Sequence, residues 1–432
     1  MENYWKLLFH RRRILPVYVA LMLHSIYAIF GSNNPGKHNQ TRVELGKSLQ
    51  KRQALPDQLR GFALLGIIVV NMPWLAFSNI GIWELQLSNL SDKVVAFLIV
   101  ALAQGKFYLL FAFLFGYSLT LILKDRSTSS FRKYLRRLAG LALLGVGHAC
   151  FFFYGDILMS YALLGLVLLL FVGRSTRTVL FVSVFSYVIG LTLLALLFFE
   201  TRGSENSVVG IIANTTSLDE AIRGSFLDSV VGRATVLPEA LLTQIVINWF
   251  PALSMFLLGL ACGRVSLLSD PSKHIRLWRS CVIVGILVGL PAGIASAWLA
   301  LVPEDPNGVY GMVGVGVGFA LAPALSAGYV GAIALLSHRR FMSYAEPAGR
   351  MSLTGYLGES ILLASIFCGW GLGLFGTLSL THSLLIALGV WVALEVFAKQ
   401  WLRRYSYGPF EWFLRSWSNL EFVKLRKSEQ FS

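Results

Sequence analysis

The sequence predicts an all-α protein, a polytopic transmembrane helix bundle of about ten spans. Of its 432 residues, 56% are hydrophobic and only 14% are charged, whereas soluble domains carry about 25% charged residues. Apolar runs of membrane-crossing length recur along the whole chain, and about 20 apolar residues are what a transmembrane helix needs. A bilayer core offers no water to backbone N–H and C=O groups, so runs of this kind fold as helices.

The spans are expected at ten apolar runs: 59–78, 94–123, 135–153, 157–172, 178–198, 241–264, 280–301, 310–336, 352–374 and 383–401. Their connections alternate between cationic segments and segments that are acidic or poor in cations. Since cationic connections stay on the cytoplasmic side, both ends of this core are predicted to be cytoplasmic. The run 94–123 is long for one span, so it is expected to be tilted or broken at Gln104–Lys106.

Outside these spans the chain divides into four predicted regions. Residues 1–55 form a basic and hydrophobic extension with a linker, and the apolar segment 14–31 within it either lies at the interface or adds a span of reversed orientation. Residues 56–240 form a first membrane region with an outside loop at 199–240, which is either a lid or a connector. Residues 241–420 form a second region that ends in an interfacial helix near 407–417. Residues 421–432 are a cytoplasmic tail.

Several function classes are excluded. The net charge is +15, but the cations cluster between apolar runs as topology signals, so nucleic-acid binding is not expected. The four cysteines lie far apart in apolar runs, without metal-ligand spacing or a disulfide framework. No glycine-rich phosphate loop or zinc-protease motif is present. No bound metal or bound cofactor is expected.

The stretch 132–165 concentrates the polar residues that are costly to place in a membrane. His148 stands alone in an apolar run, and Asp156 follows at its outer end. Asn71 and His148 each lie eleven residues beyond a cytoplasmic arginine, Arg60 and Arg137, so both are expected roughly 16 Å deep and in a shared site. An equally weighted alternative is a helix hairpin whose buried histidine only bonds a neighbouring helix.

Further polar residues form a second group of candidates. Glu359, nine residues beyond Arg350, is expected roughly 13 Å deep, either paired or protonated. Lys106 and Asp156 are expected at the same outer depth and could form an ion pair, with a structural role slightly favoured. Ser352 is a candidate N-cap. The glycine-rich segment 369–376 favours close helix packing over a substrate site.

The chain resembles the YeiB-like bacterial membrane proteins in five stretches that follow the family order: 57–71, 105–116, 136–165, 349–360 and 401–417. Gly355 and Glu359 stand where the family more usually has Asn and Gln. The resemblance implies a fold like that of the transmembrane acyltransferases, which move an acetyl group from cytoplasmic acetyl-CoA to a sugar amine. It would place Arg60, Gly61 and Asn71 on the first span. The histidine that those enzymes carry shortly after the asparagine is missing from residues 72–92.

The expected function is therefore that of a bacterial inner-membrane acyltransferase-like protein, with acetyl-CoA or another acyl-CoA as co-substrate and a hydroxyl or amine as acceptor. His148, Asn71 and Asp156 are the candidate catalytic residues, with His148 as general base. The candidate substrate-binding residues are Arg60, Lys106, Arg137, Arg350 and Glu359. A proton-coupled transporter or exporter and a non-catalytic partner subunit remain alternatives. The expected partners are the lipid bilayer and a second copy of the chain.

Overall fold

The computed structural model describes residues 54–77, 81–84, 87, 89–123, 127–201, 215–302 and 308–427. The predicted extension up to residue 53, including the apolar segment 14–31, lies outside these residues. The described chain is built from helices, with a single isolated β-bridge between Tyr405 and Arg426. The predicted all-α class is confirmed.

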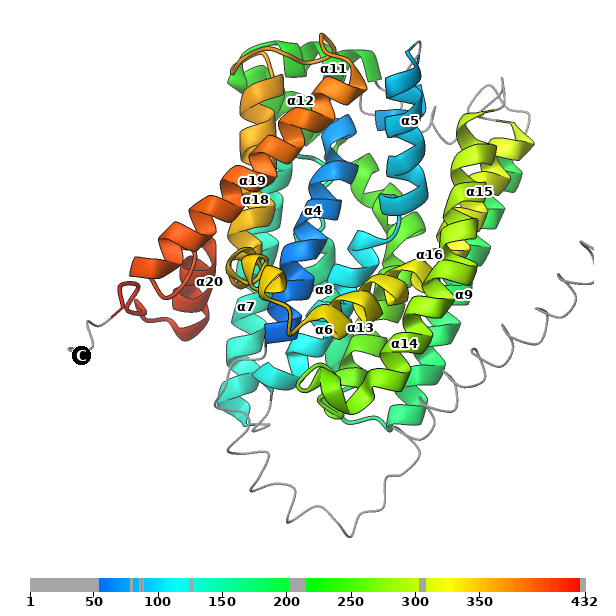
Figure 1. Cartoon of the computed structure of the whole chain (residues 1–432). Coiled ribbons are helices and arrows are strands. Elements are labelled where there is room, and N and C mark those ends of the chain that lie inside the picture. Colours follow the sequence, from blue (N-terminus) through cyan, green and yellow to red (C-terminus); the bar gives the residue numbers. More distant parts are fainter. Residues whose placement is uncertain are drawn as a thin grey trace, which may run out of the picture.

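The helices form an upright bundle with a smaller C-terminal helix at its side (Figure 1). They are α4 (Ala54–Ala76), α5 (Leu90–Leu98), α6 (Phe107–Ile122), α7 (Thr128–Phe151), α8 (Leu158–Leu169), α9 (Thr176–Thr201), α11 (Thr215–Arg223), α12 (Phe226–Gln244), α13 (Phe250–Arg264), α14 (Ile275–Val284), α15 (Leu290–Leu301), α16 (Val309–Leu336), α17 (Glu346–Arg350), α18 (Ser352–Phe367), α19 (Leu380–Arg404) and α20 (Pro409–Asn419). Short π-helical segments follow α5 and join α12 to α13 and α14 to α15.

Within the described ranges, seven helical stretches are long and apolar enough to cross a membrane: 54–76, 90–122, 176–199, 226–264, 271–301, 309–336 and 380–404. The chain is thus a multi-pass membrane protein. The three other predicted spans fall on α7, which carries cations in its first half, and on the shorter apolar helices α8 and α18. The count of ten spans stays a prediction.

Two local predictions have different outcomes. The break at Gln104–Lys106 is confirmed, because a turn with Gly105 at a φ of 79° separates the helical segment 90–103 from α6. The segment 199–240, predicted to be an outside loop, is largely helical where it is described, and its place outside the membrane stays a prediction. Apart from residues 202–214, which are not described, it consists of the end of α9, α11 and most of α12, and α12 continues through a π segment into α13. The predicted boundary at 240 therefore falls inside a continuous helical stretch.

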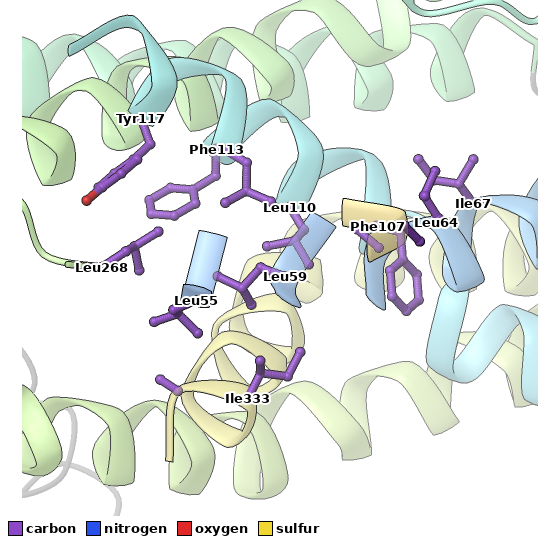
Figure 2. Close-up of a cluster of buried hydrophobic side chains, with 14 of the residues drawn as sticks. Leu55, Leu59, Leu64, Ile67, Phe107, Leu110, Phe113, Tyr117, Leu268 and Ile333 are labelled. Atoms are coloured by element: carbon purple, nitrogen blue, oxygen red, sulfur yellow. The ribbon is translucent and has the colours of Figure 1, made fainter. Parts of the chain in front are cut away.

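The helix α4 lies at the centre of the bundle, in contact with α6, α17, α18 and α19. Leu55, Leu59 and Leu64 of α4 belong to a buried cluster that also contains Phe107 and Leu110 of α6 (Figure 2). Gly66 of α4 makes this approach close, since a β-carbon there would overlap the Phe107 ring. A helix that is apolar on all sides is expected to be buried in this way.

The helices α6 and α13 pack even more closely, backbone against backbone. A β-carbon on Gly116 would overlap the carbonyl oxygen of Phe256, and one on Gly259 would overlap that of Phe113. In a membrane, small residues allow such approach and the dispersion contacts that come with it. The segment 369–376 lies between α18 and α19, where Gly369 and Gly371 abut the backbone of Arg223 and Ser365. Gly373 and Gly376 in the same segment take a positive φ of 67° and 69°. The glycines thus serve close backbone approach and turns, and the choice between helix packing and a substrate site stays a prediction.

Candidate functional site

His148 and Asp156 form a buried pair, called the dyad below. The Nδ1 atom of His148 lies 2.8 Å from Oδ2 of Asp156, and the two side chains are 2% and 1% exposed. The hydroxyl of Tyr356 donates to the same carboxylate oxygen at 3.2 Å. An ionised carboxylate only accepts hydrogen bonds, so the geometry fits the tautomer of His148 that carries its proton on Nδ1.

The local chain geometry brings the dyad together at the end of α7. The helix closes with the amides of Phe152 and Phe153 both donating to the carbonyl of His148 at 2.9 Å. Asp156 then caps the start of α8, since its Oδ1 accepts from the amide of Leu158 at 2.7 Å. Gly145 permits this tight return, because a β-carbon there would lie 2.8 Å from Oδ1 of Asp156.

The second ring nitrogen of His148 is available for chemistry. With the proton on Nδ1, the neutral ring presents the lone pair of Nε2 as an acceptor. That atom is buried and has no hydrogen-bond partner among the described residues. The ring lies near Tyr356, Phe152 and Phe153, at centroid distances of 5.4, 6.4 and 6.5 Å. Chemically, a ring held in this way can act as an oriented general base among aromatic side chains.

Tyr356 is a member of this site that the sequence interpretation missed. It lies on α18, far along the chain, and its hydroxyl also accepts from the amide of Ile157 at 3.2 Å. The sequence offered one indication of its importance: it lies in the stretch 349–360 that carries the family resemblance, three residues before Glu359. Spacing within one helix could not show that this hydroxyl meets the turn between α7 and α8.

The predicted ion pair between Lys106 and Asp156 is wrong. Lys106 is 2% exposed, and its Nζ donates to the carbonyl oxygen of Val100 at 2.8 Å. The turn at 104–106 brings the side chain back to the π segment before it. Rise along one helix estimates the depth of a residue but not the direction in which its side chain points.

Asn71 is partly buried on α4, and no hydrogen bond between described residues joins it to the dyad. Its helix packs mainly on α6 and on α17 to α19, whereas α7 packs on α8, α12 and α20. The expected shared site of Asn71 and His148 is therefore not supported by these contacts. Its catalytic role stays a prediction.

Arginines gather near the start of α4 and in the first half of α7. Arg60 donates to Asp57 at 2.9 Å and to Ser118 at 2.6 Å. Arg137 lies close enough to Arg60 and Arg415 to interact electrostatically with both. Arg415, on α20, was not among the predicted site residues. Arg350 ends α17, the short helix that packs on α4.

Ser352 is not the N-cap predicted for α18. The capping position is occupied by Met351, which makes no side-chain cap bond. The amides of Leu353 and Thr354 instead donate to Glu411 of α20, at 2.7 and 3.0 Å. A carboxylate from another helix supplies the acceptor that the local sequence lacks.

Glu359 lies on the same helix as Tyr356, but it lines a separate pocket with Glu395. In the residues that the structure describes, no three or more His, Cys, Asp or Glu side chains gather into a group able to hold a metal ion.

Comparison with known proteins places the chain among uncharacterised bacterial proteins. Residues 262–421 match a family model described as a protein of unknown function, DUF418. The chain is 31% identical over 409 residues to the uncharacterized protein YxaH of Bacillus subtilis (strain 168), which covers 87% of this chain and 96% of the relative. It is 28% identical over 389 residues to the uncharacterized protein YeiB of Escherichia coli (strain K12), covering 84% and 96%.

A third relative is an uncharacterized 39.9 kDa protein in the amylase 3′ region of Bacillus acidopullulyticus, 26% identical over 405 residues, with 88% of this chain and 98% of the relative covered. No solved structure matches the chain. The similarity extends over nearly the full length of each relative, and the chain belongs to the YeiB-like DUF418 family of membrane proteins.

Proposed function

We propose that this protein is an acyltransferase of the bacterial inner membrane in which His148 is the general base. The observation that supports the proposal is the buried dyad, with Nδ1 bonded to Asp156 and Nε2 without a partner among the described residues. Orientation by a carboxylate is the arrangement that makes a histidine an effective base in acyl transfer. The proposal also accords with the resemblance of the sequence to transmembrane acyltransferases.

In the proposed step, the hydroxyl or amine of the acceptor gives its proton to Nε2 of His148. The acceptor oxygen or nitrogen forms a bond to the acyl carbon of an acyl-CoA, and the carbon–sulfur bond breaks. The departing CoA thiolate takes the proton back from the imidazolium. Asp156 remains ionised throughout and stabilises the imidazolium, while Tyr356 holds the carboxylate in place.

The donor would enter from the cytoplasmic side. Arg60, Arg137 and Arg415 gather there, and guanidinium groups suit the phosphates of a CoA ester. Because the dyad side chains are only 2% and 1% exposed, the acyl chain and the acceptor would reach Nε2 after displacement of the neighbouring aromatic rings. Closure of the rings around the bound substrates would then exclude water from the reacting atoms.

The test is calorimetric binding of acetyl-CoA and longer acyl-CoAs to the detergent-purified protein, followed by release of free CoA with a polar or lipid extract as acceptor source. We expect dissociation constants between about 1 μM and 1 mM, the usual range for substrates. His148→Gln should still bind acyl-CoA but lose about 10²–10⁴-fold in the rate of CoA release.

The controls separate binding from chemistry. Arg137→Gln should weaken binding, whereas Tyr161→Phe, which removes a hydroxyl bonded to the carbonyl of Tyr108, should change neither quantity. If the folded protein binds no CoA ester, the acyltransferase proposal is abandoned. Proton-coupled uptake into proteoliposomes would then test the transporter alternative.

A further inference from the structure

A small pocket between α4, α18 and α19 contains two glutamate side chains. Its wall includes Leu64 of α4, Gly355 and Glu359 of α18, and Trp391 and Glu395 of α19. Neither His148 nor Asp156 lines it. The proposed acyl-transfer step does not use the pocket.

The carboxyl groups of Glu359 and Glu395 are buried and form no hydrogen bond within the described part of the chain. Glu359 is 3% exposed, and all four carboxyl oxygens of the pair are buried without a partner there. Of the residues that the structure describes, no lysine, arginine or histidine lines the pocket. Two ionised carboxylates in such surroundings would pay the cost of lost hydration and repel each other, with nothing to compensate.

The charged groups on the surrounding helices are engaged elsewhere. On α4, Asp57 and Arg60 pair at 2.9 Å. On α19, the ammonium of Lys399 lies 4.9 Å from the centroid of the Tyr344 ring. On α20, Glu411 accepts hydrogen bonds at the start of α18. Arg350 of α17 also has interactions of its own, and it does not line the pocket.

Two side chains in the pocket wall carry a hydrogen-bond donor, and the hydroxyl of Thr354 already donates to Glu411. The indole N–H of Trp391 is buried, has no partner among the described residues, and belongs to the pocket wall. A donor at this place favours one negative charge beside it and disfavours a metal cation. Two carboxyl groups in one buried site cannot both carry a negative charge at low cost. One proton held between them leaves a single charge, as in other buried acid pairs.

We propose that Glu359 and Glu395 form an intramembrane proton-binding site that holds one shared proton, with the indole of Trp391 donating to the remaining charge. The site joins α18 to α19. Since α18 also carries Tyr356, one helix contacts both the proton site and the dyad. Loss of the proton would place two negative charges on these two helices and weaken their contact.

The test uses dicyclohexylcarbodiimide, an apolar reagent that adds to protonated carboxyl groups in membrane segments, on the full-length purified protein. Mass spectrometry of peptides then locates the adduct. We expect labelling at Glu359 or Glu395 near neutral pH, with the yield falling as the pH rises. Glu411 provides a comparison outside the pocket, because its carboxyl oxygens already accept the hydrogen bonds at the start of α18, and its labelling should be weaker than that of the pocket pair.

Variants test whether the two carboxyl groups share the proton. In Glu359→Gln, labelling at Glu395 should require a lower pH, because the neighbouring charge that favours its proton has been removed. Absence of any adduct on the folded protein, or labelling of both residues independent of pH, would overturn the proposal. Protection by Na⁺ or Li⁺ at constant pH would overturn it too, by assigning the pocket to a metal cation. None of these results depends on acyl-CoA binding, so the two proposals fail separately.

Discussion

The hydroxyl of Tyr356 serves two partners at once, and this makes it the most informative single group near the dyad. It donates to Asp156 and accepts from the amide of Ile157, both at 3.2 Å. Removing it leaves a buried carboxylate with one bond fewer and a buried amide without its acceptor. An unsatisfied buried group costs more than the net value of an ordinary hydrogen bond.

We therefore expect Tyr356→Phe to lower the free energy of unfolding by about 1–3 kcal/mol. The matched variant Tyr161→Phe removes an equally buried hydroxyl that donates to one backbone carbonyl at 2.7 Å, and should cost about 0.5–1.5 kcal/mol. Reversible unfolding in mixed detergent micelles measures both values. Equal losses in the two variants would show that the hydroxyl of Tyr356 does not bridge Asp156 and Ile157.

At the scale of helices, the start of α18 depends on a residue from α20. Glu411 accepts from the amides of Leu353 and Thr354 and from the hydroxyl of Thr354. Burial raises the pKa of the Glu411 carboxyl above its ordinary value of 4.5, and the hydrogen bonds from Thr354 oppose this increase without cancelling it. The folded protein therefore binds this proton more tightly than the unfolded chain.

A raised pKa in the folded state fixes the sign of the pH effect. The contribution of this group to stability is complete below the unfolded pKa and is lost as the pH rises through the folded pKa. Glu411→Gln keeps an oxygen acceptor for the amides but does not titrate. We expect the difference in Tm, wild type minus Glu411→Gln, to decrease as the pH is raised from about 4 towards neutrality. A difference that is constant with pH, or that increases, would contradict the assignment.

For the whole molecule, the position of the cationic segments in the helix bundle predicts which end of the bundle faces the cytoplasm. The start of α4 and the connection before α14 lie at one end of the bundle, while α11 and the connection from α18 to α19 lie at the other (Figure 1). The first end carries the cationic segments, including Lys273, whose side chain is 74% exposed. The positive-inside rule therefore assigns that end to the cytoplasm.

We expect a membrane-impermeant maleimide to label Leu372→Cys in intact cells, since Leu372 is 71% exposed at the opposite end. Lys273→Cys should be labelled only after the membrane is opened. The half-buried Cys150 is replaced by serine in both variants, and the other three cysteines are buried. Labelling of Lys273→Cys alone in intact cells would reverse the orientation.

The composition and the spacing of apolar runs were sufficient to predict features that depend only on whether a segment of the chain lies in water or in the bilayer. A backbone in a bilayer must satisfy its own hydrogen bonds, so the all-α class and the break at Gln104–Lys106 could be predicted. His148 and Asp156 could be named as well, since isolated polar residues in apolar runs are costly and therefore informative. The depth estimate for Lys106 gave no direction for its side chain, and the pairing with Asp156 was wrong.

Only the tertiary structure decided which polar groups meet. His148 and Asp156 are eight residues apart, yet their bond depends on the tight return at Gly145. Tyr356 reaches the dyad, Glu411 caps α18, and Glu395 joins Glu359 across helices that are separated in the chain. Such contacts depend on helix rotation and packing, which are set by close approaches such as Gly116 to Phe256. The sequence by itself determined which residues are costly to bury, and packing determined the partners that make their burial tolerable.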